Sequence, residues 1–157
     1  MLATELAALY ARDIARLIQE LRAFPDTRTL WQTLPGVTNP AGNLALHLEG
    51  NLREYIGRQL GKVDYTRERP LEFSQKDTDK DELIARLEAV HGLVPRVVGG
   101  LSSEALATPY PEPFYGSSVS TQQFLIHLSG HLNYHLGQID YLRRVLTGDG
   151  AIALTGL

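Results

Sequence analysis

The chain has 157 residues, a length typical of one domain, with 43% hydrophobic and 21% charged residues. It contains no cysteine, which excludes a disulfide framework and a thiolate metal site. A formal net charge of -3 and the lack of a long apolar run argue against a nucleic-acid-binding or membrane-spanning protein. We expect one domain over residues 1–157, located in the cytoplasm because the N-terminus lacks the basic region of a signal peptide.

Apolar residues recur at three- and four-residue intervals in four stretches, each predicted to be a helix. The first helix spans about residues 3–23 and ends before Pro25, because the residue before a proline is pushed out of helical geometry. The second spans about residues 40–60, with Asn39 as its N-cap and Pro40 in the first helical position.

The third helix spans about residues 79–98, where Asp79 and Glu82 have the spacing of a capping pair. Pro95 lies within it and predicts a kink or an early end. The fourth helix spans about residues 120–146 and begins with a similar capping pair. The two capping pairs therefore fix the starts of the last two helices.

Four helices of this length predict an all-α fold, a four-helix bundle. The connections over residues 24–38, 62–78 and 100–118 are longer than the roughly 2–8 residues usual between antiparallel neighbours. At least one connection is therefore expected to cross over the bundle, and a simple up-down-up-down order is disfavoured. Residues 148–157 are expected to form a tail.

Three of the five histidines, His127, His131 and His135, repeat every four residues on the fourth helix. A spacing of four turns an α-helix about 40° past a full circle, so the three rings share one stripe. Leu128 and Leu132 lie on the same side, and we therefore expect the histidines to face the bundle interior. Each buried imidazole without a partner costs about 1–3 kcal/mol.

A divalent metal ion would remove that cost, because two histidines one turn apart can chelate one ion. His47, on the apolar face of the second helix, is the candidate for a third ligand. Spacing alone does not choose between the pair His127 and His131 and the pair His131 and His135. Three histidine ligands leave positions open, as in catalytic sites. The alternative is that these histidines are hydrogen-bonded core residues, as we expect for His91.

Other polar groups near these histidines are candidates for orienting metal ligands or lining a pocket. Equally, they could be surface residues of the helices without a role. The candidates are Asn43, Asn51, Glu54, Tyr55, His127 and Gln138. No aspartate or glutamate stands out as a catalytic base, so the catalytic residues are unknown at this point.

Gly130 and Gly137 lie seven residues apart on the fourth helix and are flanked by Tyr134 and Tyr141. Small residues at this spacing let another helix approach closely. One interpretation is a neighbouring helix of the same chain, and the other is a homodimer contact. The sequence does not decide between them.

The histidine pattern, with His131-x3-His135-x-Gly137-Gln138 on the fourth helix, resembles the DinB-like (YfiT-like) superfamily of metal-binding four-helix proteins. The segments 36–47 and 137–144 are typical of one branch of it, and the resemblance covers essentially the whole chain. It implies an up-down-down-up bundle, often dimeric, that binds zinc, nickel or iron through His47, His131 and His135. His127 matches an upstream histidine that is not usually a ligand.

Relatives of this kind include S-transferases that use bacillithiol or mycothiol and a mycothiol-dependent maleylpyruvate isomerase. A metal that binds a thiol lowers its pKa, so that a thiolate attacks at neutral pH. Because the chain has no cysteine, a low-molecular-weight thiol would enter as a cosubstrate. The resemblance therefore implies a thiol S-transferase or detoxification enzyme with a small-molecule substrate. The alternatives are a non-catalytic, stress-related metal-binding dimer and a hydrolase that uses metal-bound water.

Overall fold

A computed structural model gives the fold and describes residues 1–153. Its elements are α1 (Leu2–Arg22), α2 (Thr27–Leu30), α3 (Ala41–Leu52), the π-helical segment η1 (Arg53–Arg58), α4 (Arg69–Ser74), α5 (Lys80–Gly99), α6 (Ser103–Ala107) and α7 (Thr121–Thr147). Between residues 1 and 153 there are isolated β-bridges but no strands. The predicted all-α class is confirmed. The end of the predicted tail, residues 154–157, lies outside the described residues.

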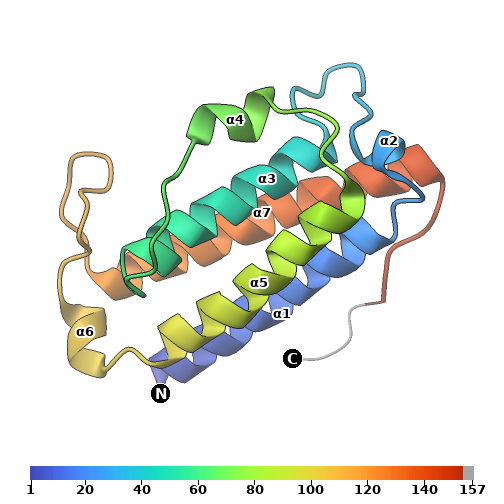
Figure 1. Ribbon diagram of the computed structural model, residues 1–157. Helices are drawn as coiled ribbons and strands as arrows, with labels where there is room; N and C mark the ends of the chain where they lie inside the picture. Colours follow the sequence, from blue (N-terminus) through green and yellow to red (C-terminus); the bar gives the residue numbers. More distant parts are fainter. Residues whose placement is uncertain (154–157) are drawn as a thin grey trace.

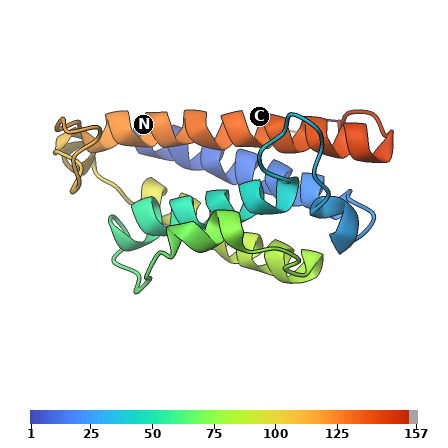
Figure 2. The ribbon, with the colours of Figure 1, turned by 90° about the horizontal axis from the view of Figure 1, so that it is seen from above.

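Four long helices build the molecule and lie side by side (Figure 1). Helix α1 packs against α5 and α7, and α3 packs against α7, α5 and α4. Seen from above, α1 and α7 form one side and α3, α4 and α5 the other (Figure 2). The core between them consists mainly of leucine, isoleucine and valine side chains from the apolar stripes of these helices.

The second predicted helix is α3 continued by η1, and its first residue differs from the prediction. Pro40 occupies the N-cap position with extended backbone angles, and the helix begins at Ala41. The prediction of Asn39 as N-cap is therefore wrong. The π-helical turn that follows Leu52 was not predicted either; its wider hydrogen bonding is often found near functional sites.

The third and fourth predicted helices correspond to α5 and α7. Asp79 caps α5 by accepting hydrogen bonds from the backbone N–H of Asp81 at 2.9 Å and of Glu82 at 3.3 Å. Helix α5 continues through Pro95 to Gly99, so the early end suggested by the proline does not occur. Buried apolar residues on both sides of the proline keep this turn packed in the core.

The three long connections contain the short helices α2, α4 and α6, which the sequence did not predict. Asp26 caps α2 by accepting from the Thr29 N–H at 2.7 Å, and Ser102 caps α6 by accepting from the Ala105 N–H at 3.1 Å. Helix α4 lies along α3 (Figure 1). This contact places Glu72, a residue of the second connection, beside the face of α3 that holds His47.

A partly buried polar contact joins α1 to α7. Asp13 is fully buried and accepts a hydrogen bond from Asn133 Nδ2 at 2.7 Å, while Arg12 and Arg16 pair with its carboxylate at 2.8 and 3.3 Å. Near the other end of α7, Arg143 pairs with Glu20 at 2.5 Å. These ion pairs and the hydrogen bond hold α1 and α7 in a fixed position relative to each other.

Gly130 and Gly137 are exposed on α7, and a Cβ atom at either position would meet no neighbouring element within 4 Å. The interpretation that these glycines let another helix of the same chain pack closely is therefore wrong for residues 1–153.

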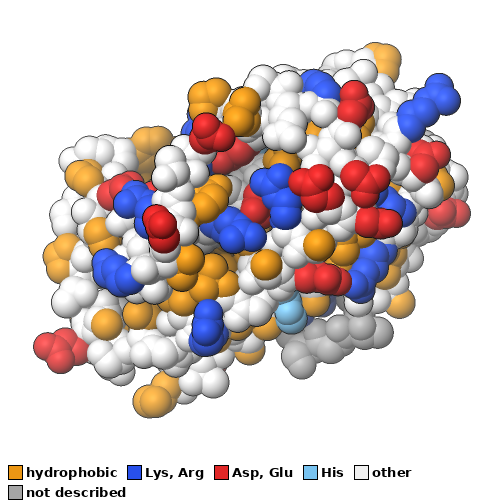
Figure 3. Space-filling view, viewed as in Figure 1, with side chains coloured by type: hydrophobic (Ala, Val, Ile, Leu, Met, Phe, Trp, Pro, Cys, Tyr) orange, Lys and Arg blue, Asp and Glu red, His pale blue; other side chains and the backbone are white. Residues whose placement is uncertain are grey.

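Acidic and basic side chains are interspersed on the face that carries α4 and α5 (Figure 3). Many of them pair: Glu49 bonds to Arg53 at 2.5 Å and to Arg86 at 2.7 Å, and Arg22 bonds to Glu88 at 2.5 Å. This face is unlike the clustered basic surface that binds nucleic acid. Among residues 1–153, no helix combines the length and the apolar character that crossing a membrane requires.

Candidate metal centre

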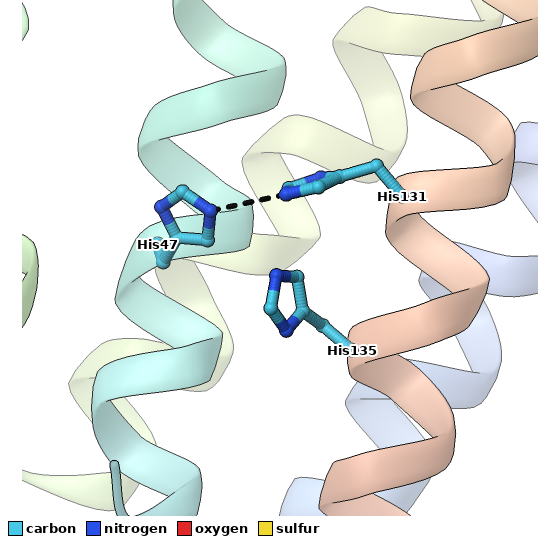
Figure 4. A group of neighbouring side chains, drawn as sticks. All are labelled: His47, His131 and His135. Carbon is cyan, nitrogen blue, oxygen red and sulfur yellow. Dashed lines mark hydrogen bonds between the residues drawn. The ribbon is translucent and has the colours of Figure 1, made fainter. Parts of the chain in front are cut away.

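Three histidines from two helices converge near the middle of the molecule. His47 comes from α3, and His131 and His135 come from successive turns of α7 (Figure 4). Each offers one ring nitrogen, and these three nitrogens lie within 4.8 Å of one another. The Nε2 atoms of His47 and His131 are 3.1 Å apart. Such a group of imidazole nitrogens is a set of ligands that zinc, nickel and iron accept.

Two of the three rings are oriented by a bond to the nitrogen that faces away from the cluster. Nδ1 of His47 lies 2.8 Å from Oε2 of Glu72, and Nδ1 of His135 lies 2.7 Å from Oε1 of Gln138. Both bonds leave Nε2 directed at the common space. Metal-binding histidines almost always donate their other N–H to such a partner. His131 differs, because its Nδ1 is buried and has no hydrogen-bond partner among the described residues.

Glu72 is held on both sides. Arg67 donates from Nε to Oε1 at 2.6 Å and from a terminal nitrogen to Oε2 at 2.9 Å. Burial raises the pKa of the Glu72 carboxyl, but the hydrogen bonds from His47 and Arg67 outweigh it and hold the pKa below its ordinary value. The guanidinium of Arg67 also lies over the ring of Tyr55, 5.4 Å from its centre. An ionised carboxylate therefore faces His47 at neutral pH.

The position of Glu72 depends on two residues of α3. Asn43 is fully buried and donates from Nδ2 to the backbone oxygens of Glu72 at 2.8 Å and Gln75 at 2.9 Å, while Lys76 donates to its Oδ1 at 2.6 Å. Gly50 leaves the space that the carboxylate fills, since a Cβ there would overlap the Glu72 side chain. The predicted candidate Asn43 therefore acts on α4 rather than on the histidines.

The environment favours the neutral form of the His131 and His135 imidazoles. Burial, reinforced by the neighbouring His135 and His47, lowers the pKa of His131 to about 4. Burial also lowers the pKa of His135, although its bond to Gln138 acts in the opposite direction. A metal ion binds the neutral form of imidazole, so no proton has to leave these two rings at neutral pH.

His127 does not join the cluster. Its side chain is exposed, and its ring packs against Phe114 at a centroid distance of 4.4 Å. The expectation that all three histidines of α7 face the interior is therefore wrong for His127. Near the start of α7, Phe114 of the preceding connection packs against the rings of both Phe124 and His127.

Two of the other candidates lie beside the cluster and one lies apart. Asn51, one turn after His47 on α3, is 6% exposed, and Tyr55 on η1 is partly buried. Glu54 bonds to Arg58 instead, and this bond lowers the pKa of its carboxyl. The expectation that His91 is a hydrogen-bonded core residue is wrong: its side chain is only partly buried on α5, and no hydrogen bond of its ring is found within the described part of the chain.

Two cavities reach the histidine cluster, one on each side. A cavity of about 310 Å³ is bordered by His47 and His131 and by charged and aromatic side chains, and a second of about 560 Å³ opens at His135 and Gln138. The smaller is lined in addition by Asn51, Tyr55, Arg67, Arg69, Glu112, Pro113, Phe114, Tyr115, Phe124, His127 and Leu128. Small molecules therefore have access to the cluster from two directions.

Sequence reasoning missed Glu72 and Arg67. Both lie in the second connection, where no helical period directs attention to them, and Glu72 is the one buried residue of the short helix α4. Glutamate is rarely buried without a partner, but nothing in the sequence marks this one as buried. The only available signal was that a metal-binding histidine usually has a carboxylate or carbonyl partner.

The fold and the site define an all-α protein with a three-histidine candidate metal centre between two of its long helices. The chain belongs to the DinB superfamily, whose sequence model matches residues 9–139. A similar solved structure is a DinB-like protein from Bacillus cereus ATCC 10987, with a TM-score of 0.70 and 16% sequence identity, over 97% of this chain and 95% of that chain. At this identity the likeness concerns the fold. No curated protein matches the chain.

Proposed function

We propose that this protein is a metal-dependent enzyme that transfers a small thiol to an electrophilic substrate. The observation that carries the proposal is the convergence of His47, His131 and His135 on one space that two cavities reach. A divalent ion bound there would hold a thiol and lower its pKa, so that the thiolate forms at neutral pH. Zinc, nickel and iron all suit three imidazoles.

The surrounding residues prepare the site for this role. Glu72 and Gln138 fix the tautomer and direction of two rings, and burial favours the neutral form of His131 and His135. The chain has no cysteine, so the reacting thiol would be a cosubstrate such as bacillithiol or mycothiol. Access from two sides gives room for the thiol and the electrophile to meet at the cluster.

The test incubates untagged, zinc-loaded protein with a panel of small thiols and electrophiles. Turnover is measured as the loss of free thiol. Wild-type protein is expected to turn over at least one pair, and His131→Ala is expected to lose both the ion and the activity. His91→Ala is the matched control, since His91 lies outside the cluster. Equal thiol turnover in wild type and His131→Ala would contradict the proposal.

A second candidate is a non-catalytic role in which the ion only ties α3 to α7. It is favoured by the origin of the ligands, since His47 lies on one helix and the other two on its neighbour. Removal of the ion would then lower the melting temperature strongly without any thiol turnover. The hydrolase alternative has less support, because Glu72, the carboxylate nearest to His47, is already occupied by His47 and Arg67.

We propose the up-down-down-up order for the four long helices. The colours in Figure 1 run in one direction along α1 and α7 and in the other along α3 and α5. Parallel α3 and α5 need a connection that returns along the bundle, and the connection that contains α4 does so beside α3.

We also propose that the protein is a homodimer that pairs through α7. Four large apolar side chains on this helix are 53–66% exposed, and Gly130 and Gly137 lie among them, where a partner helix can approach closely. These side chains are Ile126, Tyr134, Tyr141 and Val145. Tyr141→Glu is expected to convert a dimer to a monomer in sedimentation experiments, whereas Tyr115→Glu, on an exposed loop, is expected not to. A monomeric wild-type protein would contradict the proposal.

A further inference from the structure

The connection between α6 and α7 contains a tight turn whose first central residue is a tyrosine. The backbone N–H groups of Phe114 and Ser117 each donate to the carbonyl oxygen of the other residue at 2.9 Å, so Tyr115 and Gly116 form the centre of the turn. Both have a positive φ, 47° at Tyr115 and 79° at Gly116. A turn with two left-handed central residues favours Asn-Gly. The backbone is therefore strained at Tyr115, whose Cβ crowds the following carbonyl oxygen.

Packing does not compensate for this strain among the described residues. The side chain of Tyr115 is 91% exposed, and its ring contacts Phe114 edge-on at a centroid distance of 4.6 Å. Strained residues of this kind gather at ligand-binding and catalytic sites. Tyr115 thus costs the fold stability, and its position points to a role outside folding.

Tyr115 stands at one end of a row of four aromatic side chains. From Tyr115 the row continues to Phe114, and then to Phe124 and Tyr55 at successive centroid distances of 5.6 and 5.4 Å. All four residues line the smaller cavity, of about 310 Å³. His47 and His131 line the same cavity, so an occupant held by the aromatic row lies beside the candidate metal centre.

The cavity suits a small flat molecule. Its volume of about 310 Å³ lies at the small end of ligand sites. Aromatic side chains bind another aromatic ring through edge-to-face and offset contacts, which the row provides from its strained end to η1. The uncharged part of an occupant is therefore expected to be an aromatic ring.

The charges around the cavity leave one arginine free. Arg67 is paired with Glu72, and Glu112 is paired with Arg58. Arg69 lines the cavity and makes no ion pair within residues 1–153. A group that leaves the substrate as an anion would therefore meet a positive charge on the cavity wall.

We propose that the aromatic row binds the electrophile as an arylalkyl halide, and that Tyr115 determines specificity by covering its ring. The inference rests on the proposed function, in which a small thiol attacks an electrophile. The thiolate sulfur forms a bond to the carbon beside the ring, the carbon–halogen bond breaks, and the halide leaves with the bonding electron pair towards Arg69. The proton of the thiol passes to water.

The first test is binding of benzyl alcohol, an unreactive analogue of benzyl chloride, to the untagged full-length protein by NMR titration. Tyr115→Asn is expected to weaken binding about fivefold, because one aromatic contact is lost. Its melting temperature is expected to rise by about 2–4 °C, because asparagine suits the turn. Tyr115→Phe keeps the ring and should keep the affinity. Ser118→Asn is the matched control, since Ser118 is exposed in the same connection and does not line the cavity.

The second test is turnover by zinc-loaded protein with bacillithiol and either benzyl chloride or chloroacetamide, after subtraction of the uncatalysed rate. Chloroacetamide has the same leaving group but no ring. Wild-type protein is expected to prefer benzyl chloride in kcat/KM. Tyr115→Asn is expected to lower this preference about fivefold through KM, and Ser118→Asn is expected to keep it.

Weaker binding of benzyl alcohol by a more stable Tyr115→Asn protein supports the inference, because a purely structural tyrosine would lower the stability when replaced. Affinity within about twofold of wild type, or no binding by wild type, overturns it. Turnover of chloroacetamide without turnover of benzyl chloride refutes only this inference. Binding of benzyl alcohol that depends on Tyr115, without thiol turnover by the zinc-loaded protein, supports the aromatic site and refutes only the proposed function.

Discussion

Replacing Glu72 by glutamine keeps the shape of the side chain but removes the charge between His47 and Arg67. In the native protein its two oxygens accept from His47 at 2.8 Å and from Arg67 at 2.6 and 2.9 Å. The amide of glutamine has one accepting oxygen, and its nitrogen can only donate. At least one of these donors therefore loses its partner in a buried position.

The size of the effect follows from these contacts. A hydrogen bond to a charged group contributes about 1.5–3 kcal/mol, so the free energy of unfolding of the metal-free protein is expected to fall by about that amount. Loss of a partner that orients a metal-binding histidine typically costs about 10–100-fold in metal affinity. We therefore expect the zinc Kd of Glu72→Gln to rise by about 10–100-fold.

Zinc affinity is measured by competition with a coloured chelator, and stability by urea unfolding of the metal-free protein. Glu68→Gln is the matched control, because Glu68 lies in the same connection and is exposed. We expect the control to match wild type in both measurements. A zinc Kd for Glu72→Gln within about twofold of wild type would refute the role assigned to this carboxylate.

Three further predictions concern the space around Glu72, protonation and metal binding. Gly50→Ala should displace the Glu72 carboxylate, weaken zinc binding and lower the free energy of unfolding by about 0.5–2 kcal/mol, because the helix propensity of alanine offsets only part of the hydrogen bonds that Glu72 loses; equal zinc affinity would count against this packing. The metal-free protein should lose stability as the pH falls from about 6.5 to about 4, because the unfolded chain takes up a proton on His131 before the folded chain does. This loss should be smaller in His131→Gln, and identical pH profiles would contradict it. Zinc at 100 times its Kd should stabilise the fold by about 2.7 kcal/mol, and a melting temperature unaffected by zinc would exclude a site formed only in the folded state.

The long helices were predictable because each carries an apolar stripe over several turns. The regular spacing of leucine, isoleucine and valine in α1, α5 and α7 reports which face is buried, and this does not depend on distant contacts. Helices α2, α4 and α6 have four to six residues, too few for a period to show. Their starts depend on local caps such as Asp26 and Ser102, which occur in many turns as well.

The histidines were predictable as a group but not in detail. Spacing places His127, His131 and His135 on one stripe, and it cannot tell where along that stripe α3 comes close enough for His47 to reach. Glu72, the partner of His47, could not be predicted from the sequence for a related reason. Glu72 reaches it only because Asn43 holds α4 against α3 and Gly50 leaves room for the carboxylate.

The measurement that tests the central claim most directly is the metal content of untagged protein by elemental analysis, with His47→Ala, His131→Ala and His135→Ala beside wild type. His127→Ala is the control, because His127 shares the helix and the spacing but lies outside the cluster. We predict about one equivalent of zinc, nickel or iron in wild type and in His127→Ala, and loss of the ion in the three other variants. Equal metal content in all five proteins, or none in wild type after zinc and nickel are supplied, would contradict the three-histidine metal centre.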